Sequence, residues 1–281
     1  MVAIFLPVVL VGEVVALFFP FDSRLIIDFL LSFYNIPFAV FGLWLFRAIL
    51  LELEVTKANS NFLILILGVC TAYWKYSVTD FSEVTQAVFL LGIVYSIISN
   101  DQNKWKKASF WCSLLITVKL VYVVLIPILT VYAYLEKGTN LRRRIRISNV
   151  VDLSLFLIPL GFLLAFANFI RFGSIFEAGY GTYGAAFSTN YLRRDLFDYI
   201  FSFQRGILPF NPILLLALPC WFAIPKKFKG FFILIFLLCI LWIVLMSCWV
   251  SFQGGWCWGN RLLVPIIPLL LLPLALSLIH I

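Results

Sequence analysis

The chain has 281 residues, of which 63% are hydrophobic and only 12% are charged, and its formal net charge is +8 at pH 7. A water-soluble globular protein is excluded, because it would have to expose large apolar patches. A transmembrane β-barrel is excluded because the apolar runs are continuous rather than alternating. We therefore predict an all-α, polytopic transmembrane protein that forms a single domain over residues 1–281.

The apolar runs predict about ten membrane segments, because about 20 residues are needed to cross the hydrocarbon core. Two of these segments form a short hairpin, since the run from Ala108 to Glu136 carries Lys119 near its middle, where we expect a turn. The predicted segments are 3–20, 26–48, 61–77, 85–100, 108–120, 121–136, 149–170, 211–224, 230–250 and 262–279.

The loops between these segments alternate in charge along the chain. Dense basic clusters, such as residues 142–146, alternate with loops of mixed charge. Because basic loops stay in the cytoplasm, the positive charge predicts a topology with both termini in the cytoplasm, rather than a nucleic-acid-binding role. The mixed-charge loops hold the chemically distinctive residues. We place them on the periplasmic or extracellular face of a cell membrane, such as a bacterial inner membrane.

The largest predicted external loop spans about residues 171–210 and combines glycine, aromatic and charged residues. Arg171 closes the preceding segment, and Tyr180 stands between two glycines that permit close backbone approach to a ligand. The stretch 191–203 predicts an amphipathic helix in the plane of the membrane interface. Its polar face is expected to carry Arg193, Arg194, Asp195 and Asp198.

Three titratable residues outside this loop are candidate substrate contacts. Asp80 and Glu83 would share one face of a starting helix. They either cap that helix and complement its dipole, or line an external cavity and orient a polar substrate. A charged lysine inside an apolar hairpin costs free energy, so its presence indicates a functional site. Lys119 either binds a phosphate as a point charge or extends its ammonium group to the interface.

A fourth candidate region precedes the last predicted segment and reads WVSFQGGWCWGNRLLVP at residues 249–265. Trp256 offers an aromatic face that suits the apolar face of a sugar ring, and Arg261 offers a planar fork for a phosphate. The alternative for the tryptophans is an aromatic belt at the membrane interface, although such a belt does not require the three neighbouring glycines.

Taken together, these segments resemble the second half of bacterial GT-C superfamily membrane glycosyltransferases. The most similar group is the dolichyl-phosphate-mannose–protein mannosyltransferase and aminoarabinose transferase-like family. The resemblance covers roughly residues 25–279. It rests on the order and spacing of YS-x-x-x-x-SE at 76–83, RFGS-x-x-E-x-GYG at 171–181, RG-x-x-x-x-NP at 205–212 and GGW-x-WG-x-R-LL-x-P at 254–265.

This resemblance implies an inverting enzyme that uses a polyprenyl-phosphate-linked sugar as donor on the non-cytoplasmic side of the bilayer. It implies no further cofactor, and it leaves the sugar, the acceptor, any divalent metal and the oligomeric state open. By position, Glu83, Lys119, Arg171, Tyr180 and Arg261 would line the cavity. Lys119 and Arg261 would hold the lipid phosphate.

Members of that family carry an acid in a long first external loop, whereas the corresponding loop here is only FDSR, at 21–24. The catalytic residue is therefore unassigned, and we expect a fragment or a degenerate member of the family. Two alternative functions stay open. One is a transporter or lipid flippase, for which Glu13 is the acid placed inside a segment. The other is a non-catalytic membrane remnant.

Overall fold

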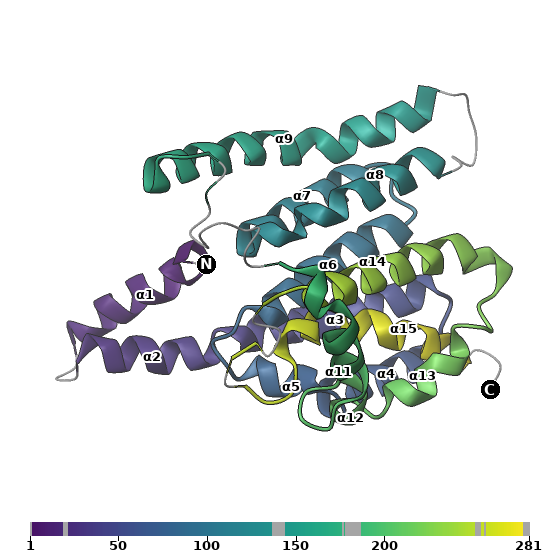
Figure 1. The fold of residues 1–281 in the computed structure, drawn as a ribbon, viewed down its shortest axis with the longest axis horizontal. Helices are drawn as coiled ribbons and strands as arrows, with labels where there is room; N and C mark the ends of the chain where they lie inside the picture. The colour runs from purple at the N-terminus through teal and green to yellow at the C-terminus, as the bar shows by residue number, and fades with distance from the viewer. Residues whose placement is uncertain are drawn as a thin grey trace.

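The computed structural model describes residues 2–18, 22–136, 144–175, 177, 187–250, 254–255 and 257–277. Every regular element in these ranges is a helix, which confirms the predicted all-α class. The helices pack as a bundle from which the α1–α2 hairpin projects (Figure 1). They are α1 Val2–Ala16, α2 Ser23–Phe33, α3 Asn35–Glu52, α4 Lys57–Val69, α5 Ala72–Ser77, α6 Glu83–Ile98, α7 Lys104–Val118, η1 Leu120–Val124, α8 Leu125–Leu135, α9 Arg144–Phe172, η2 Thr189–Tyr191, α11 Leu192–Phe201, α12 Ile207–Phe210, α13 Leu214–Cys220, η3 Lys226–Phe228, α14 Lys229–Ser247, η4 Arg261–Ile266 and α15 Ile267–Ser277.

Within the described residues, three helical stretches are long and apolar enough to cross a membrane: Ser23–Glu52, Ile147–Phe172 and Lys226–Ser247. The second of them lies along one edge of the bundle, outside α7 and α8 (Figure 1). Most of its apolar side chains are exposed. A helix that is apolar all round is typical of a membrane span. Other apolar helices are shorter. Helix α4, with 13 residues, extends about 20 Å against a hydrocarbon core of about 30 Å.

Two of the predicted membrane segments have a different structure. The stretch 61–77 is divided between α4 and α5, because the Thr71 side chain caps the start of α5. The stretch 211–224 contains only the seven-residue helix α13. Pro219 lies in its last turn and cannot donate a backbone hydrogen bond, which limits its extension. Neither stretch is a single helix of membrane-spanning length.

The apolar run 108–136 forms a hairpin, as the sequence predicts. Helix α7 ends immediately before Lys119, which has an extended backbone with φ −151° and ψ 109°, and η1 begins immediately after it. Lys104 Nζ, at the start of α7, lies 2.7 Å from Glu136 Oε1, just beyond α8. The two arms are therefore antiparallel, and Lys119 is at their turn.

Helix α6 lies at the centre of the bundle, and all of its 16 residues except Tyr95 and Ile98 are buried. Its neighbours approach closely where glycines lie at the contact. A Cβ atom on Gly42 of α3 would lie 3.0 Å from Val88 Cγ2 of α6, and one on Gly92 of α6 would lie 2.5 Å from the Trp111 ring of α7. Small residues permit this close packing of helices. The first residue of α6, Glu83, is thereby carried into the interior.

The two ends of the bundle differ in chemistry, and contacts between loops join residues within each end. At the basic end, Lys227 contacts Glu54. At the site end, the Tyr76 hydroxyl donates a hydrogen bond to the Trp258 carbonyl oxygen at 2.6 Å. We define the basic end by Glu54, Lys104, Glu136 and Lys226–Lys229, and the site end by Tyr76, Glu83, Lys119, Trp258 and Arg261.

Candidate functional site

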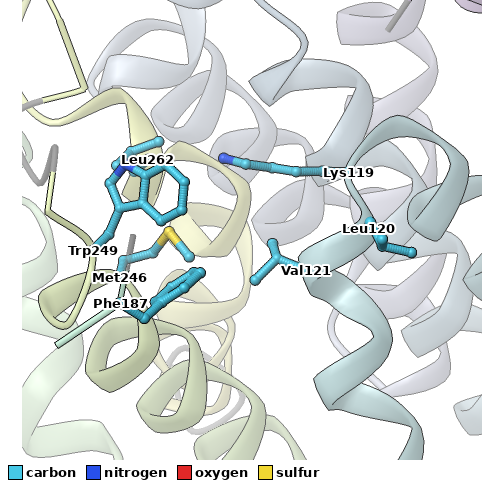
Figure 2. A pocket seen from close by; sticks show the side chains of 7 residues that line it. All are labelled: Lys119, Leu120, Val121, Phe187, Met246, Trp249 and Leu262. Atoms are coloured by element: carbon cyan, nitrogen blue, oxygen red, sulfur yellow. The ribbon is translucent and has the colours of Figure 1, made fainter. Parts of the chain in front are cut away.

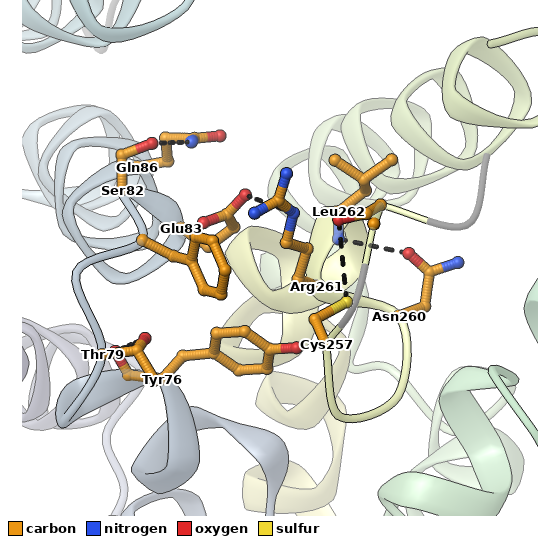
Figure 3. A network of polar contacts seen from close by, with 12 residues as sticks. Tyr76, Thr79, Ser82, Glu83, Gln86, Cys257, Asn260, Arg261 and Leu262 are labelled. Carbon is orange, nitrogen blue, oxygen red and sulfur yellow. Dashed lines mark hydrogen bonds and ion pairs between the residues drawn. The ribbon is translucent and has the colours of Figure 1, made fainter. Parts of the chain in front are cut away.

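Three charged side chains that are far apart in the sequence converge at the site end. Arg261 Nε lies 3.7 Å from Glu83 Oε1, and the two side chains face each other in Figure 3. The guanidinium carbon of Arg261 lies 4.2 Å from the ring centroid of Phe81. Lys119 Nζ lies 5.9 Å from the ring centroid of Trp242 and is close enough to affect the ionisation of Glu83. We call Glu83, Lys119 and Arg261 the charged cluster.

The loop that leads into Glu83 is held by Asn35, the first residue of α3. Asn35 is 0% exposed, and its amide nitrogen donates hydrogen bonds to the carbonyl oxygens of Thr79, at 2.6 Å, and Phe81. Its amide oxygen accepts a hydrogen bond from the Thr85 hydroxyl at 3.2 Å. These bonds fix the loop against α3 and α6, so that Glu83 begins α6 in a buried position.

A glycine-rich turn places Arg261. Gly254 and Gly259 have φ values of 69° and 64°, a region that glycine adopts without strain. The side-chain oxygen of Asn260 then accepts a hydrogen bond from the backbone N–H of Leu262 at 3.1 Å. This bond caps η4, whose first residue is Arg261. The turn thus ends with the guanidinium directed at the start of α6 (Figure 3).

A series of hydrogen bonds and ring contacts connects the segments that carry the three charges. The Tyr122 hydroxyl donates to Gln86 Oε1 at 2.8 Å, and Gln86 Nε2 donates to the Ser82 hydroxyl at 2.8 Å. The Tyr122 ring stacks on Trp242, with centroids 4.1 Å apart and planes 1° apart. Trp242 Nε1 donates to the Leu262 carbonyl oxygen at 2.8 Å. This network fixes the positions of the three charged residues relative to one another.

We expect Tyr122→Phe to lower the free energy of unfolding by about 1–2 kcal/mol, because the buried Gln86 oxygen loses its donor while the stacked ring remains. Thermal denaturation of the purified protein in detergent, followed by circular dichroism, measures this change. Tyr132→Phe is the matched control, since the Tyr132 hydroxyl has no hydrogen bond with any described residue. Equal losses of stability in the two variants would contradict the network.

A small cavity adjoins the charged cluster (Figure 2). Its volume is about 40 Å³, which is room for a few water molecules or a small anion. Lys119 is the one charged residue among the described residues that line it, and in Figure 2 its side chain extends toward Leu262. The remaining described wall is largely apolar and comes from the hairpin, from the loop after α9, from the end of α14 and the residues that follow it, and from η4: Leu120, Val121, Phe187, Met246, Trp249 and Leu262.

Three buried polar atoms at the site have no hydrogen-bond partner among the described residues: Glu83 Oε2, Arg261 Nε and Asn260 Nδ2. An unpaired buried polar group costs about 1–3 kcal/mol, so such atoms usually bind water or a ligand. One of the three atoms accepts hydrogen bonds and two donate them. The site therefore suits a polar ligand that offers both hydrogen-bond donors and acceptors.

Burial shifts the ionisation of Glu83 and Lys119 toward their neutral forms. Removal from water raises the pKa of Glu83, and the nearby charges of Lys119 and Arg261 oppose this rise. Burial likewise lowers the pKa of Lys119, with Glu83 opposing the change and Arg261 reinforcing it. With all three groups ionised, the cluster has two positive charges and one negative charge, so it favours an additional anion.

Two predicted site residues lie away from the cluster. Asp80 is exposed and precedes the first residue of α6, so the predicted helix face shared with Glu83 is wrong. Its negative charge still contributes to the raised pKa of Glu83. Arg171 is exposed at the end of α9, with its guanidinium carbon 5.2 Å from the Phe172 ring centroid. Within the described ranges, Arg171 makes no ion pair with the cluster.

Tyr180 and Trp256 stay predictions, because both lie outside the residues that the structure describes. The stretch 191–203 contains the helix α11, but Asp195, one of the residues predicted on its polar face, is buried. Asp195 is 0% exposed, because α11 packs its Asp195 and Tyr199 side on α14. The Tyr199 hydroxyl donates to the Met246 carbonyl oxygen at 3.0 Å.

The sequence interpretation missed the uncharged residues that hold the site together: Asn35, Gln86, Tyr122 and Trp242. For the two amides a signal exists, because an amide inside an apolar run must find partners when it is buried. For the two aromatics there is none. They occur in a chain with 30 Phe, 11 Tyr and 9 Trp residues, where nothing local distinguishes them.

Comparison of the chain with protein-family models, curated proteins and solved structures finds no match. Within the described residues, no group of three or more His, Cys, Asp or Glu side chains is placed to hold a metal ion. The polar groups that the described site presents are those of lysine, arginine, glutamate and amide side chains. Two cations beside one carboxylate and an apolar wall suit an anionic ligand with an apolar part.

Proposed function

We propose that this chain is a membrane glycosyltransferase-like protein. It would bind a polyprenyl-phosphate-linked sugar and transfer the sugar to an acceptor on the non-cytoplasmic face. The observation that carries the proposal is the convergence of Glu83, Lys119 and Arg261 in one buried cluster. Lys119 supplies a point charge for a phosphate, and Arg261 supplies a planar fork that can bind two phosphate oxygens.

The cavity wall favours a lipid-linked phosphate over a free one. The residues beside Lys119 are apolar, including Val121 of the hairpin and Met246 of α14. Helix α14 is also one of the three candidate membrane spans. A ligand whose phosphate reaches Lys119 therefore has apolar side chains on which to place an apolar tail, as a polyprenyl chain requires.

In the proposed reaction, a hydroxyl or amine of the acceptor attacks the anomeric carbon of the sugar. The bond from that carbon to the phosphate oxygen breaks, and the lipid phosphate leaves with the electron pair while the acceptor releases its proton. Lys119 and Arg261 stabilise the charge that develops on the leaving phosphate. Glu83, 3.7 Å from Arg261, orients that side chain and the polar groups of the substrate. We assign no residue as the proton acceptor.

The proposal places the site end on the periplasmic or extracellular face, and the basic end and both termini in the cytoplasm. The lysines at the starts of α7 and α14 support this orientation, because basic loops remain on the cytoplasmic side. In the same proposal, the five shorter apolar helices, together with α7 and α13, join the three long ones, so that about ten stretches of the chain lie in the bilayer.

A transfer assay tests this function. The purified protein is placed in vesicles of native membrane lipid and acceptor, with radiolabelled polyprenyl-phosphate mannose or polyprenyl-phosphate aminoarabinose as the donor. We expect release of free polyprenyl phosphate that depends on the protein and is reduced in Lys119→Ala. Binding of both donors without release of lipid phosphate would reject the transfer reaction.

We also expect phosphate binding to weaken as the pH rises. Lys119 must be protonated to bind the anion, and burial lowers its pKa, so the loss begins below the pH at which an exposed lysine titrates. Protonation of Glu83 at low pH removes a negative charge and does not weaken binding by the site.

Lys119→Arg keeps its charge, so it should retain affinity at a pH where the wild type loses it. Titration with a fluorescent polyprenyl phosphate from about pH 6 to pH 10 measures this difference, and coincident profiles would contradict it.

A transporter or lipid flippase is a second candidate, favoured by the interruption of the hairpin at Lys119. A charged residue at a break between helices, next to a cavity, is a feature of transporter binding sites. Glu13, the acid singled out for this function, is exposed on α1. Movement of a labelled lipid phosphate across vesicles, without sugar transfer, would favour this candidate over the transferase.

A further inference from the structure

A second, larger groove lies between α8 and α14, separate from the charged cluster. Its volume is about 310 Å³, and its lining is apolar and aromatic, including Val131 and Leu135 of α8 and Ile233 of α14. The stacked pair of Tyr122, on η1, and Trp242, on α14, each 1% exposed, lies between this groove and the cavity at Lys119 along the hairpin and α14. The groove is therefore a distinct feature of the bundle.

The groove opens to the surroundings of the bundle rather than to its core. Val131 is 57% exposed, Leu135 is 61% exposed and Ile233 is 51% exposed, and all three are aliphatic. Because α14 is a candidate membrane span, these side chains face lipid when the helix crosses the bilayer. From Pro127 to Leu135 the groove extends about 12 Å along α8.

Two lysines lie at the end of the groove that belongs to the basic end of the bundle. Lys229 precedes Ile233 by four residues and Leu237 by eight, so the three lie on one face of α14, about 6 Å apart along its axis. Lys226 lies one turn earlier, on η3, and both lysines are exposed. Neither forms an ion pair with an acid in the described part of the chain, whereas Lys227 contacts Glu54.

The acid at the end of α8 does not cancel this positive charge. Glu136 Oε1 lies 2.7 Å from Lys104 Nζ, and Glu136 Oε2 accepts a hydrogen bond from Trp105 Nε1 at 3.2 Å. Both carboxylate oxygens are therefore already paired. The mouth of the groove at the basic end carries a surplus of positive charge from Lys226 and Lys229.

We propose that this groove binds one acyl chain of an anionic phospholipid, with the lipid phosphate held by Lys226 and Lys229. The apolar lining matches the chain, and the two ammonium groups, which form no ion pair with any described acid, match the negative headgroup. The N-terminal dipole of the 19-residue helix α14 adds to this attraction. A zwitterionic headgroup, with no net charge, gains much less from the same lysines. The site does not depend on the proposed sugar transfer.

Native mass spectrometry of the full chain in detergent tests the proposal, with phosphatidylglycerol and phosphatidylcholine of the same acyl chains as probes. We expect phosphatidylglycerol to be retained more tightly. The double variant Lys226→Gln, Lys229→Gln should reduce its affinity roughly 25-fold, at about five-fold per lysine. The matched control is Lys106→Gln, Lys107→Gln, which removes the same charge from α7, where Asp152 and Asp101 already pair with the two lysines.

A third variant tests the groove itself. Val131→Trp places a large ring in the groove without disturbing the core, because Val131 is 57% exposed. We expect it to reduce retention of both phospholipids, with circular dichroism confirming an unchanged helix content. Equal retention of the two lipids, equal effects of the two double lysine variants, or undiminished binding in Val131→Trp would each overturn the assignment.

Discussion

Replacing Arg261 with alanine is expected to reduce the affinity for a polyprenyl phosphate roughly 10- to 100-fold. Hydrogen bonds to a charged group contribute about 1.5–3 kcal/mol, and about 1.4 kcal/mol corresponds to a factor of ten. Arg261 also lies 3.7 Å from Glu83, so its removal leaves the buried carboxylate without its nearest cation and adds repulsion against the phosphate. Lys119→Ala should have an effect of similar size, because it removes the charged group that lines the cavity.

Quenching of a fluorescent polyprenyl phosphate by the purified protein in detergent measures these affinities. Arg47→Ala is a matched control, since Arg47 bonds to Asn61 on the surface of α3 and α4 and should leave binding within about two-fold of wild type. Glu83→Gln provides a test of opposite sign. It removes the single negative charge of the cluster, so affinity for the phosphate should stay equal or rise. Unchanged binding in both Lys119→Ala and Arg261→Ala would reject the phosphate site.

The position of a single charge could be predicted from the sequence, because few local structures accommodate a charged side chain within an apolar run. Lys119 illustrates this: a lysine inside a long apolar stretch predicted a turn, and the structure has α7 end and η1 begin around it. The meeting of Glu83 with Arg261 was a proposal from resemblance alone. Their approach depends on how α6 and η4 pack and on the hydrogen bonds of the Asn35 side chain. No local sequence pattern predicts either of these.

The number of membrane segments shows a different limit. A run of apolar residues is equally consistent with a helix that faces lipid and with one that is buried among other helices. Helix α6 is apolar because it lies at the centre of the bundle, whereas Ile147–Phe172 is apolar and mostly exposed. Burial also explains the error at Asp195, whose place in an amphipathic pattern predicted exposure although the helix packs that side on α14.

Asn35→Ala is expected to produce the largest loss of stability among the variants considered. The substitution removes the two bonds that the amide donates to the carbonyl oxygens of Thr79 and Phe81, and the one that it accepts from Thr85. Because Asn35 is 0% exposed, water does not readily replace them. Each buried polar group that loses its hydrogen-bond partner costs about 1–3 kcal/mol, so we expect the free energy of unfolding to fall by about 3–5 kcal/mol in total. That corresponds to a fall of roughly 6–20 °C in the thermal midpoint.

The same variant separates the role of Asn35 in stability from its role in forming the phosphate site. Asn61→Ala is the matched control, because it makes the same substitution at an exposed asparagine. It should change the thermal midpoint by little. Below its midpoint, Asn35→Ala should still bind polyprenyl phosphate less tightly than wild type, because the released loop carries Phe81, whose ring centroid lies 4.2 Å from the guanidinium carbon of Arg261 and helps to position that cation. A normal thermal midpoint would show that these bonds do not hold the loop. A lowered midpoint with normal binding would show that the loop is not needed to form the phosphate site.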